Sequence, residues 1–95
     1  MEPIEKIQDR VTVACTFRLR DPISLAVPVK MRWRGQEITF TELALRHPTT
    51  RGQRMLHVFD MTDGTNDYRL EFDAEALTWT LTAVLAGGAR HVPSE

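Results

Sequence analysis

The feature that most constrains the fold is a pair of alternating apolar and polar runs between residues 68 and 85. Tyr68, Leu70 and Phe72 share one face of the first run, and a short polar link separates it from the second. The second run carries apolar residues on one face at Leu77, Trp79, Leu81, Ala83 and Leu85. This alternation is typical of a β-hairpin.

The register of this hairpin is constrained, because a slip of one residue would turn one apolar set toward water. The preferred pairs are Phe72 with Leu77, Leu70 with Trp79 and Tyr68 with Leu81. Leu70 and Trp79 are therefore expected at the centre of the core. Two strands alone expose too much apolar surface to be stable, so the rest of the chain must cover them.

Length and composition indicate one small globular domain spanning residues 1–95. The chain has 95 residues, of which 42% are hydrophobic, and a formal net charge of -1. This balance shows no global excess of charge for nucleic acid or a membrane surface. The single cysteine, Cys15, excludes an intrachain disulfide and favours a reducing compartment. Without a secretory signal or a long apolar run, a cytoplasmic protein is expected.

A second hairpin is predicted from residues 11–20 and 23–34, which are apolar at odd positions on both sides of the turn signal Asp21-Pro22. A three-residue connection places every apolar pair on one face. The pairs are Val11 with Trp33, Val13 with Met31, Cys15 with Val29, Phe17 with Val27 and Leu19 with Leu25. Pro28 cannot donate to a ladder, so it is expected at an edge or a bulge.

The middle of the chain is less regular. Residues 37–47 fit either a strand with a bulge near Thr41-Glu42 or a short helix with Thr39 and Glu42 as a capping box. The strand is preferred because Ile-Thr-Phe-Thr has high β propensity. Residues 47–52 form a predicted polar loop. The run 53–62 is apolar on both faces, which predicts an inner strand. Its expected partners are Met61 with Tyr68, Phe59 with Leu70 and His57 with Phe72.

The fold class that follows is all-β, with about six antiparallel strands in a small barrel or a two-layer sandwich. Whether a short helix closes one end is left open. Residues 1–9 fit either a short helical turn or an N-terminal arm laid on the sheet. Residues 87–95 are expected to be a frayed tail.

No catalytic, cofactor-binding or metal-binding residue is predicted, and an enzyme is not expected. Cys15 lies in the apolar phase of its strand, where a free cysteine behaves as a small hydrophobe that reacts slowly. None of the histidines has metal-ligand spacing with another histidine or with Cys15. These are His47, His57 and His91. The acids Asp60, Asp63 and Asp67 around Gly64 indicate a turn, since they lack the ligand spacing of a calcium loop.

Charge is segregated along the chain. Residues 10–34 hold six basic residues against one acid, and residues 60–75 hold six acids against one base. The basic residues all take the outward phase of the hairpin predicted from residues 11–20 and 23–34, and they define a candidate binding face, here called the basic face. They are Arg10, Arg18, Arg20, Lys30, Arg32 and Arg34. The preferred interpretation is a solvated face whose charges are offset by the acidic hairpin, at Glu71, Asp73 and Glu75.

Three segments resemble a small bacterial β-rich domain family of unknown function. The family pairs a proline-led strand ending in Trp-Arg-Gly, here Pro28 and Trp33-Arg34-Gly35, with two later strands. Those strands correspond to residues 68–73, Tyr-Arg-Leu-Glu-Phe-Asp, and 79–81, Trp-Thr-Leu. This chain has Arg46-His47 where the family has a tryptophan. The resemblance transfers no catalytic residue. Some members of the family are encoded near translesion-polymerase genes, which slightly favours a DNA-associated accessory role.

Three functions are therefore carried forward. The first is a non-catalytic protein-interaction or accessory module that binds a protein partner, or a second copy of itself, through a sheet edge or the basic face. The second is a nucleic-acid-binding accessory domain that uses the basic face. The third is an enzyme of unrecognised type. No cofactor and no membrane partner is expected.

Overall fold

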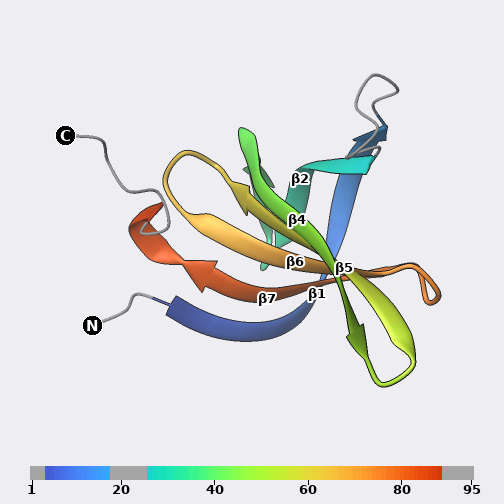
Figure 1. The fold of residues 1–95 in the computed structure, drawn as a ribbon. Coiled ribbons are helices and arrows are strands. Elements are labelled where there is room, and N and C mark those ends of the chain that lie inside the picture. Colours follow the sequence, from blue (N-terminus) through green and yellow to red (C-terminus); the bar gives the residue numbers. More distant parts are fainter. Residues whose placement is uncertain (1–3, 18–25, 89–95) are drawn as a thin grey trace.

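The computed structural model describes residues 4–17 and 26–88, and these form an all-β domain (Figure 1). The fold class predicted from the alternating runs is confirmed, with one strand more than expected. The strands are β1 (Ile4–Phe17), β2 (Ala26–Trp33), β3 (Gln36–Thr39), β4 (Glu42–Arg51), β5 (Arg54–Thr62), β6 (Asp67–Asp73) and β7 (Thr78–Leu85). A short 3₁₀ helix, η1 (Ala86–Gly88), follows β7.

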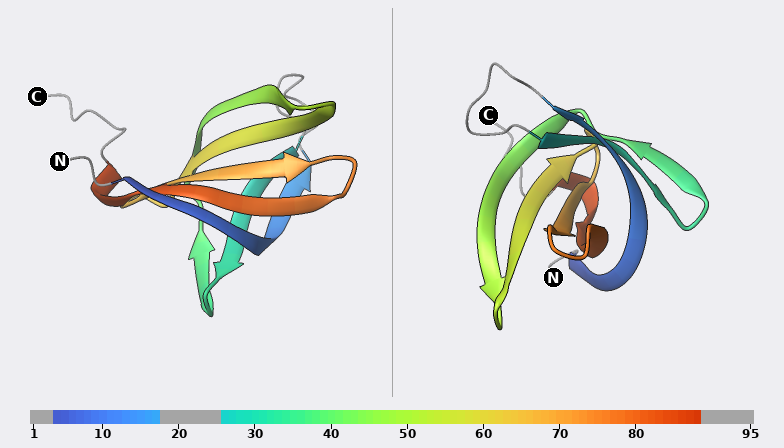
Figure 2. Two further views of the ribbon diagram at one scale, coloured as in Figure 1. Left: turned by 90° about the horizontal axis from the view of Figure 1, so that it is seen from below. Right: turned by 90° about the vertical axis from the view of Figure 1, so that its right-hand side faces the viewer.

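The strands form one antiparallel sheet in the order β3-β2-β1-β7-β6-β5-β4. Each strand pairs with its neighbours in sequence, except β3 with β4, and the first strand also pairs with the last. Only the junction between β3 and β4 is missing from a complete ring, so the sheet curls around a common interior without closing (Figure 2). Of the expected small barrel or two-layer sandwich, the structure shows a single curled sheet that does not close into a barrel.

The chain changes sheet partners at two places. In β1 the first half, up to Val11, pairs with β7, and the second half, from Thr12, pairs with β2. Between β3 and β4, the Phe40 amide donates to the Val29 carbonyl at 2.9 Å, and the Thr41 amide donates to the Thr62 carbonyl at 2.8 Å. Consecutive residues thus bind strands near the two ends of the sheet.

This crossing corrects the expected layout of the middle segment. The preference for a strand over a helix is confirmed, but the bulge lies between Leu43 and Leu45 and not at Thr41-Glu42. The predicted loop at residues 47–52 is wrong, because β4 continues to Arg51. The turn is the pair Gly52-Gln53, and Gly52 has a φ of 65°, a conformation that glycine adopts without a Cβ clash.

The register between β5 and β6 is the predicted one, with Met61 opposite Tyr68, Phe59 opposite Leu70 and His57 opposite Phe72. Strand β5 lies between β4 and β6, as its two apolar faces predict. Leu56 and Val58 are buried on the face opposite Phe59. On this face an ion pair of 3.1 Å between Arg51 of β4 and Glu71 of β6 joins the two strands that flank β5.

The register between β6 and β7 differs from the prediction. The observed pairs are Phe72 with Trp79, Leu70 with Leu81 and Tyr68 with Val84. The reason is that Leu77 belongs to the turn, where it has a φ of 59° and its amide donates to the Asp73 carbonyl. A further register shift between Arg69 and Leu70 brings Val84 inside in place of Ala83.

The hairpin of β1 and β2 is predicted correctly only in part. Val13 pairs with Met31 as expected, but Cys15 pairs with Pro28 and Phe17 with Ala26. The register shifts beside Pro28, so the predicted bulge is confirmed. The predicted turn at Asp21-Pro22 and the pair Leu19 with Leu25 lie outside the described residues.

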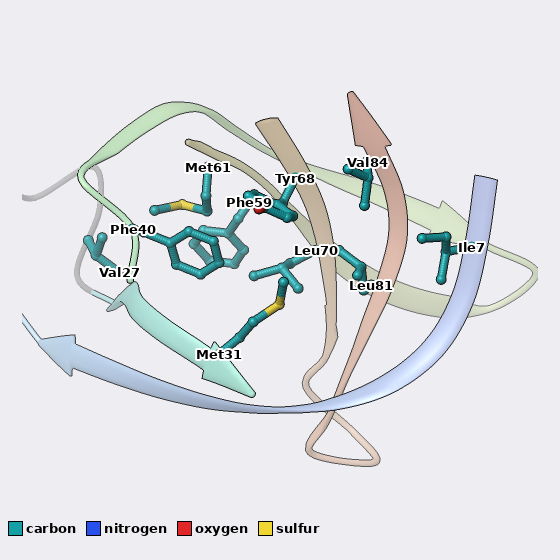
Figure 3. Close-up of a cluster of buried hydrophobic side chains, with 10 residues drawn as sticks. All are labelled: Ile7, Val27, Met31, Phe40, Phe59, Met61, Tyr68, Leu70, Leu81 and Val84. Atoms are coloured by element: carbon teal, nitrogen blue, oxygen red, sulfur yellow. The ribbon is translucent and has the colours of Figure 1, made fainter. Parts of the chain in front are cut away.

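The core gathers residues from five strands, β1, β2, β5, β6 and β7, and Phe40 from the β3–β4 crossing (Figure 3). Leu70 and Leu81 are completely buried, and Phe40 meets Tyr68 edge to face at 5.7 Å between ring centroids. The central place expected for Leu70 is confirmed. Trp79 is only partly buried and packs at the margin, with its ring centroid 4.7 Å from that of Phe72.

The first and last described segments are both bonded to neighbouring parts of the sheet. The helical turn considered for residues 1–9 is wrong from Ile4 onward, because β1 begins there and Ile4 pairs with Leu85. The sequence predicts a tail that frays from residue 87. Gly87 is instead hydrogen-bonded to the loop between β5 and β6, because its amide donates to Asn66 Oδ1 at 2.9 Å. Residues 89–95 lie outside the described residues.

Candidate interaction face

The alternation of β2 separates a buried side from a charged side. Met31 is 1% exposed, whereas Lys30 and Arg32 on either side of it are exposed. Across the sheet, Arg32 lies opposite Thr12 of β1 and Glu37 of β3. Residues opposite one another share a face, so two basic side chains and one acid gather on the outer surface of these three strands.

Small residues of β1 leave a hollow on this surface. It has a volume of about 120 Å³ and is lined by Thr12, Ala14, Lys30, Met31, Arg32 and Glu37. The lining surface is mostly apolar, and at roughly 30 Å³ per water molecule a space of this size suits one short side chain. It is below the ~300 Å³ at which pockets for drug-sized ligands begin. The hollow can therefore receive a single side chain of a partner.

One carboxylate bridges the two cations beside the hollow. Lys30 Nζ lies 3.2 Å from Glu37 Oε2, and Arg32 Nη2 lies 3.9 Å from Glu37 Oε1. All three side chains are about half exposed. One acid against two bases leaves an excess of positive charge at this place, and exposed pairs of this kind contribute only about 0–1 kcal/mol each.

A second cluster lies at the end of β2. Asp9 Oδ2 accepts a hydrogen bond from Trp33 Nε1 at 2.8 Å and one from Arg34 Nε at 3.2 Å. The Arg34 guanidinium carbon lies 4.7 Å from the centroid of the Trp33 ring, a distance typical of a cation–π contact. Arg34 and Gly35 have φ values of 52° and 78° and form the tight turn to β3. This turn fixes the Arg34 side chain beside Trp33.

The basic face predicted from the sequence is therefore divided. Lys30, Arg32 and Arg34 lie together on β2 and its turn. Arg10 is exposed on the half of β1 that pairs with β7, opposite Thr80. The pKa of Asp73 is lowered first by the backbone hydrogen bond from Ala76, with smaller effects from the charges of Arg54 and Arg10. Arg18 and Arg20 lie outside the described residues.

The expected pairing of the basic face with the acidic hairpin is wrong for its described members on β2. Glu71 pairs with Arg51 at 3.1 Å, and Asp73 pairs with Arg54 at 3.3 Å. These arginines belong to the hairpin of β4 and β5, and both lie outside the two charge-segregated segments, residues 10–34 and 60–75. Lys30 and Arg32 meet Glu37 instead, and Arg34 meets Asp9.

Glu37 could have been found from the sequence with one further step. If Arg34-Gly35 is taken as a two-residue hairpin turn, then Trp33 pairs with Gln36 and Arg32 with Glu37, as the structure has them. Asp9 carries no such local signal. It reaches Trp33 only because β1 passes from β7 to β2 just after it.

The described residues also include Cys15 and the acidic turn around Gly64. Among all the described residues, no group of three His, Cys, Asp or Glu side chains is placed to hold a metal ion. Cys15 is partly buried, and burial raises the pKa of its thiol. The predicted turn at Asp63 is confirmed, because its Oδ1 accepts from the amides of Thr65 and Asn66 at 2.8 Å each.

Comparisons with known proteins add no assignment. No family model, curated protein or solved structure matches this chain. The resemblance based on Trp33-Arg34-Gly35 and the two later strands therefore stays a prediction. Among the helices of the described residues, none has the length and apolar character needed to cross a membrane.

Proposed function

We propose that this domain is a non-catalytic protein-interaction module that binds an acidic segment of a partner protein. The binding surface is the outer face of β1, β2 and β3 around the hollow. The observation that carries the proposal is the hollow itself, because Lys30 and Arg32 stand beside an open space lined by Thr12 and Ala14. A carboxylate side chain of the partner would enter there and meet two cations.

The ends of the sheet are poorer candidates for strand addition. At one end, β3 has only four residues, Gln36–Thr39. At the other, β4 has ten residues but carries an irregular register between Leu43 and Leu45 and a proline at Pro48. Short edge strands, bulges and prolines are the features by which natural sheets prevent edge-to-edge pairing. We therefore place the binding surface on the face of the sheet and not at its edges.

An acidic protein segment suits this face better than a nucleic acid. A nucleic-acid surface presents a row of unengaged cations to successive phosphates and exposed rings for stacking. Here Lys30 and Arg32 share one carboxylate, and Arg34 is held by Asp9. Trp33 donates its indole N–H to Asp9 and lies beneath the Arg34 guanidinium. Nucleic acid is retained as an outcome of the test.

The test is binding of a fluorescein-labelled hexaglutamate peptide to the full chain, followed by anisotropy at low and high salt. The wild type should bind at low salt and lose affinity as salt is added. Arg32→Glu should weaken binding by about tenfold or more, since it removes an attraction and adds a repulsion. Lys6→Glu, a matched charge reversal at an exposed position on the other half of β1, should bind like the wild type.

Two results would overturn the proposal. One is the absence of peptide binding at concentrations up to about 1 mM, where even a weak interaction of about 4 kcal/mol is visible. The other is binding of a random single-stranded oligonucleotide at or below ~1 μM in physiological salt, lost in Arg32→Glu, which would establish the nucleic-acid function instead. Thermal melting of each variant shows whether it is folded.

A further inference from the structure

We infer that Glu37 occupies the position that the partner's carboxylate takes, so that the free domain carries its own acidic group in the binding site. The inference rests on the proposed function. It implies that Glu37 must leave the two cations when the partner's carboxylate binds them. Its basis is the bridging geometry, in which the two oxygens of one carboxylate are divided between Lys30 and Arg32.

The arrangement defines a position for a single carboxylate. Lys30 and Arg32 are two residues apart on one strand, so their Cα atoms are ~7 Å apart and their charges repel. A carboxylate between them offsets this repulsion. Glu37 fills that position from β3, and it also lines the hollow that opens beside it. An aspartate or glutamate of the partner that entered the hollow would reach the same two cations.

Glu37 can leave this position at little cost. It lies on the outermost strand of its end of the sheet, and its side chain is 48% exposed. Its contacts to Lys30 and Arg32 are of the exposed, salt-screened kind. Rotation of the side chain into solvent breaks two exposed ion pairs. The partner's carboxylate would then replace one ion pair with another of the same chemistry.

The exchange makes Glu37 a competitor that lowers the affinity of the site. An exposed pair of this strength corresponds to a factor of about two to five in a binding constant. Glu37→Gln removes the competing charge and keeps the size of the side chain. The variant should therefore bind an acidic peptide about two- to fivefold more tightly than the wild type.

The experiment measures hexaglutamate binding to the wild type, Glu37→Gln and Glu5→Gln at low and high salt. Glu5→Gln makes the same change in net charge at an exposed position of β1, seven residues from Thr12, which is ~20 Å along the strand. It should leave the affinity unchanged. The higher affinity of Glu37→Gln should disappear at high salt, because salt screens the ion pairs of Glu37 with Lys30 and Arg32 in the wild type.

The outcomes separate this inference from the proposed function. If the wild type binds and Arg32→Glu does not, but Glu37→Gln binds as the wild type or more weakly, then Glu37 organises the two cations and the inference is wrong while the function stands. An equal gain in Glu5→Gln would show an effect of net charge alone and would also overturn the inference. If no variant binds the peptide, both fail.

Discussion

Asp60 on β5 and Arg69 on β6 form a two-point ion pair across neighbouring strands. Arg69 Nε lies 2.8 Å from Asp60 Oδ1, and Arg69 Nη2 lies 3.0 Å from Asp60 Oδ2. The Asp60 side chain is 0% exposed, whereas 39% of the Arg69 side chain remains exposed. Hydrogen bonding to Asp60 raises the pKa of Arg69. A charged group is thus fully buried on the side of β5 that faces away from Phe59.

Arg69→Met should lower the free energy of unfolding by about 3 kcal/mol. The reason is that it leaves the buried Asp60 carboxylate without its guanidinium partner. Arg54→Met is the matched control, because Arg54 pairs with Asp73 from a half-exposed position, and it should cost less than about 1 kcal/mol. Urea unfolding of both variants measures the difference. Equal costs would contradict the special role of the buried pair.

Leu81→Ala should cost about 3 kcal/mol, because Leu81 is completely buried and its truncation leaves a cavity among Leu70, Met31 and their neighbours. Leu77→Ala makes the same chemical change in the same hairpin. Since Leu77 is 73% exposed, its truncation should change the stability by less than about 0.5 kcal/mol. Melting curves of the two variants that shift together would refute the observed register of β6 and β7.

Leu77→Asn should stabilise the domain by about 0.5–1 kcal/mol. Leu77 has a φ of 59°, a left-handed conformation that costs a leucine roughly 1–2 kcal/mol and that asparagine adopts more readily. Little packing is lost because the side chain is exposed. A higher midpoint in urea at unchanged slope would confirm this relief of strain. A lower midpoint would show that the exposed leucine side chain has a stabilising contact.

The acid stability of the domain should depend on Asp63. Burial acts to raise the pKa of Asp63, but hydrogen bonds from the amides of Asn66 and Thr65 and from the Tyr68 hydroxyl outweigh it, so the pKa lies below its ordinary value. The folded state therefore favours the ionised form. The resulting stability is fully present above the unfolded pKa of about 4 and is lost as the pH falls through the lower folded value.

Asp63→Asn should flatten this acid-dependent loss of stability, because asparagine does not titrate. Urea midpoints measured from neutral pH down to about pH 2 would show a smaller decrease than in the wild type. Glu5→Gln removes an exposed carboxylate of β1 and should keep the wild-type profile. An unchanged profile in Asp63→Asn would mean that other carboxylates account for the acid dependence.

The sequence was informative where apolar residues alternate without interruption. The pairing of Phe59 with Leu70 followed directly, because both strands keep a period of two through the contact. The pairing of Leu70 with Trp79 failed because Leu77 was counted as a strand residue. Its left-handed conformation is set by the turn that Asp73 closes, and hydrophobic periodicity carries no signal for it.

The candidate face was predictable to the extent that it depends on one strand. Lys30 and Arg32 share a phase on β2, and the structure places them together. Their acidic partner Glu37 depends on the turn at Arg34-Gly35. Arg10 depends on the point at which β1 leaves β7 for β2, a feature of tertiary structure that no local pattern shows.

The pairing of Ile4 with Leu85 has a consequence for the order in which the fold assembles. Five of the six pairings among the described strands join strands that are consecutive in sequence, and the sixth joins β1 to β7. Loop closure makes such a distant pairing slow, so the local hairpins form before it. During synthesis the first half of β1 is made early and waits until β7 has emerged. Throughout that interval its unpaired edge is open to pairing with strands of other chains.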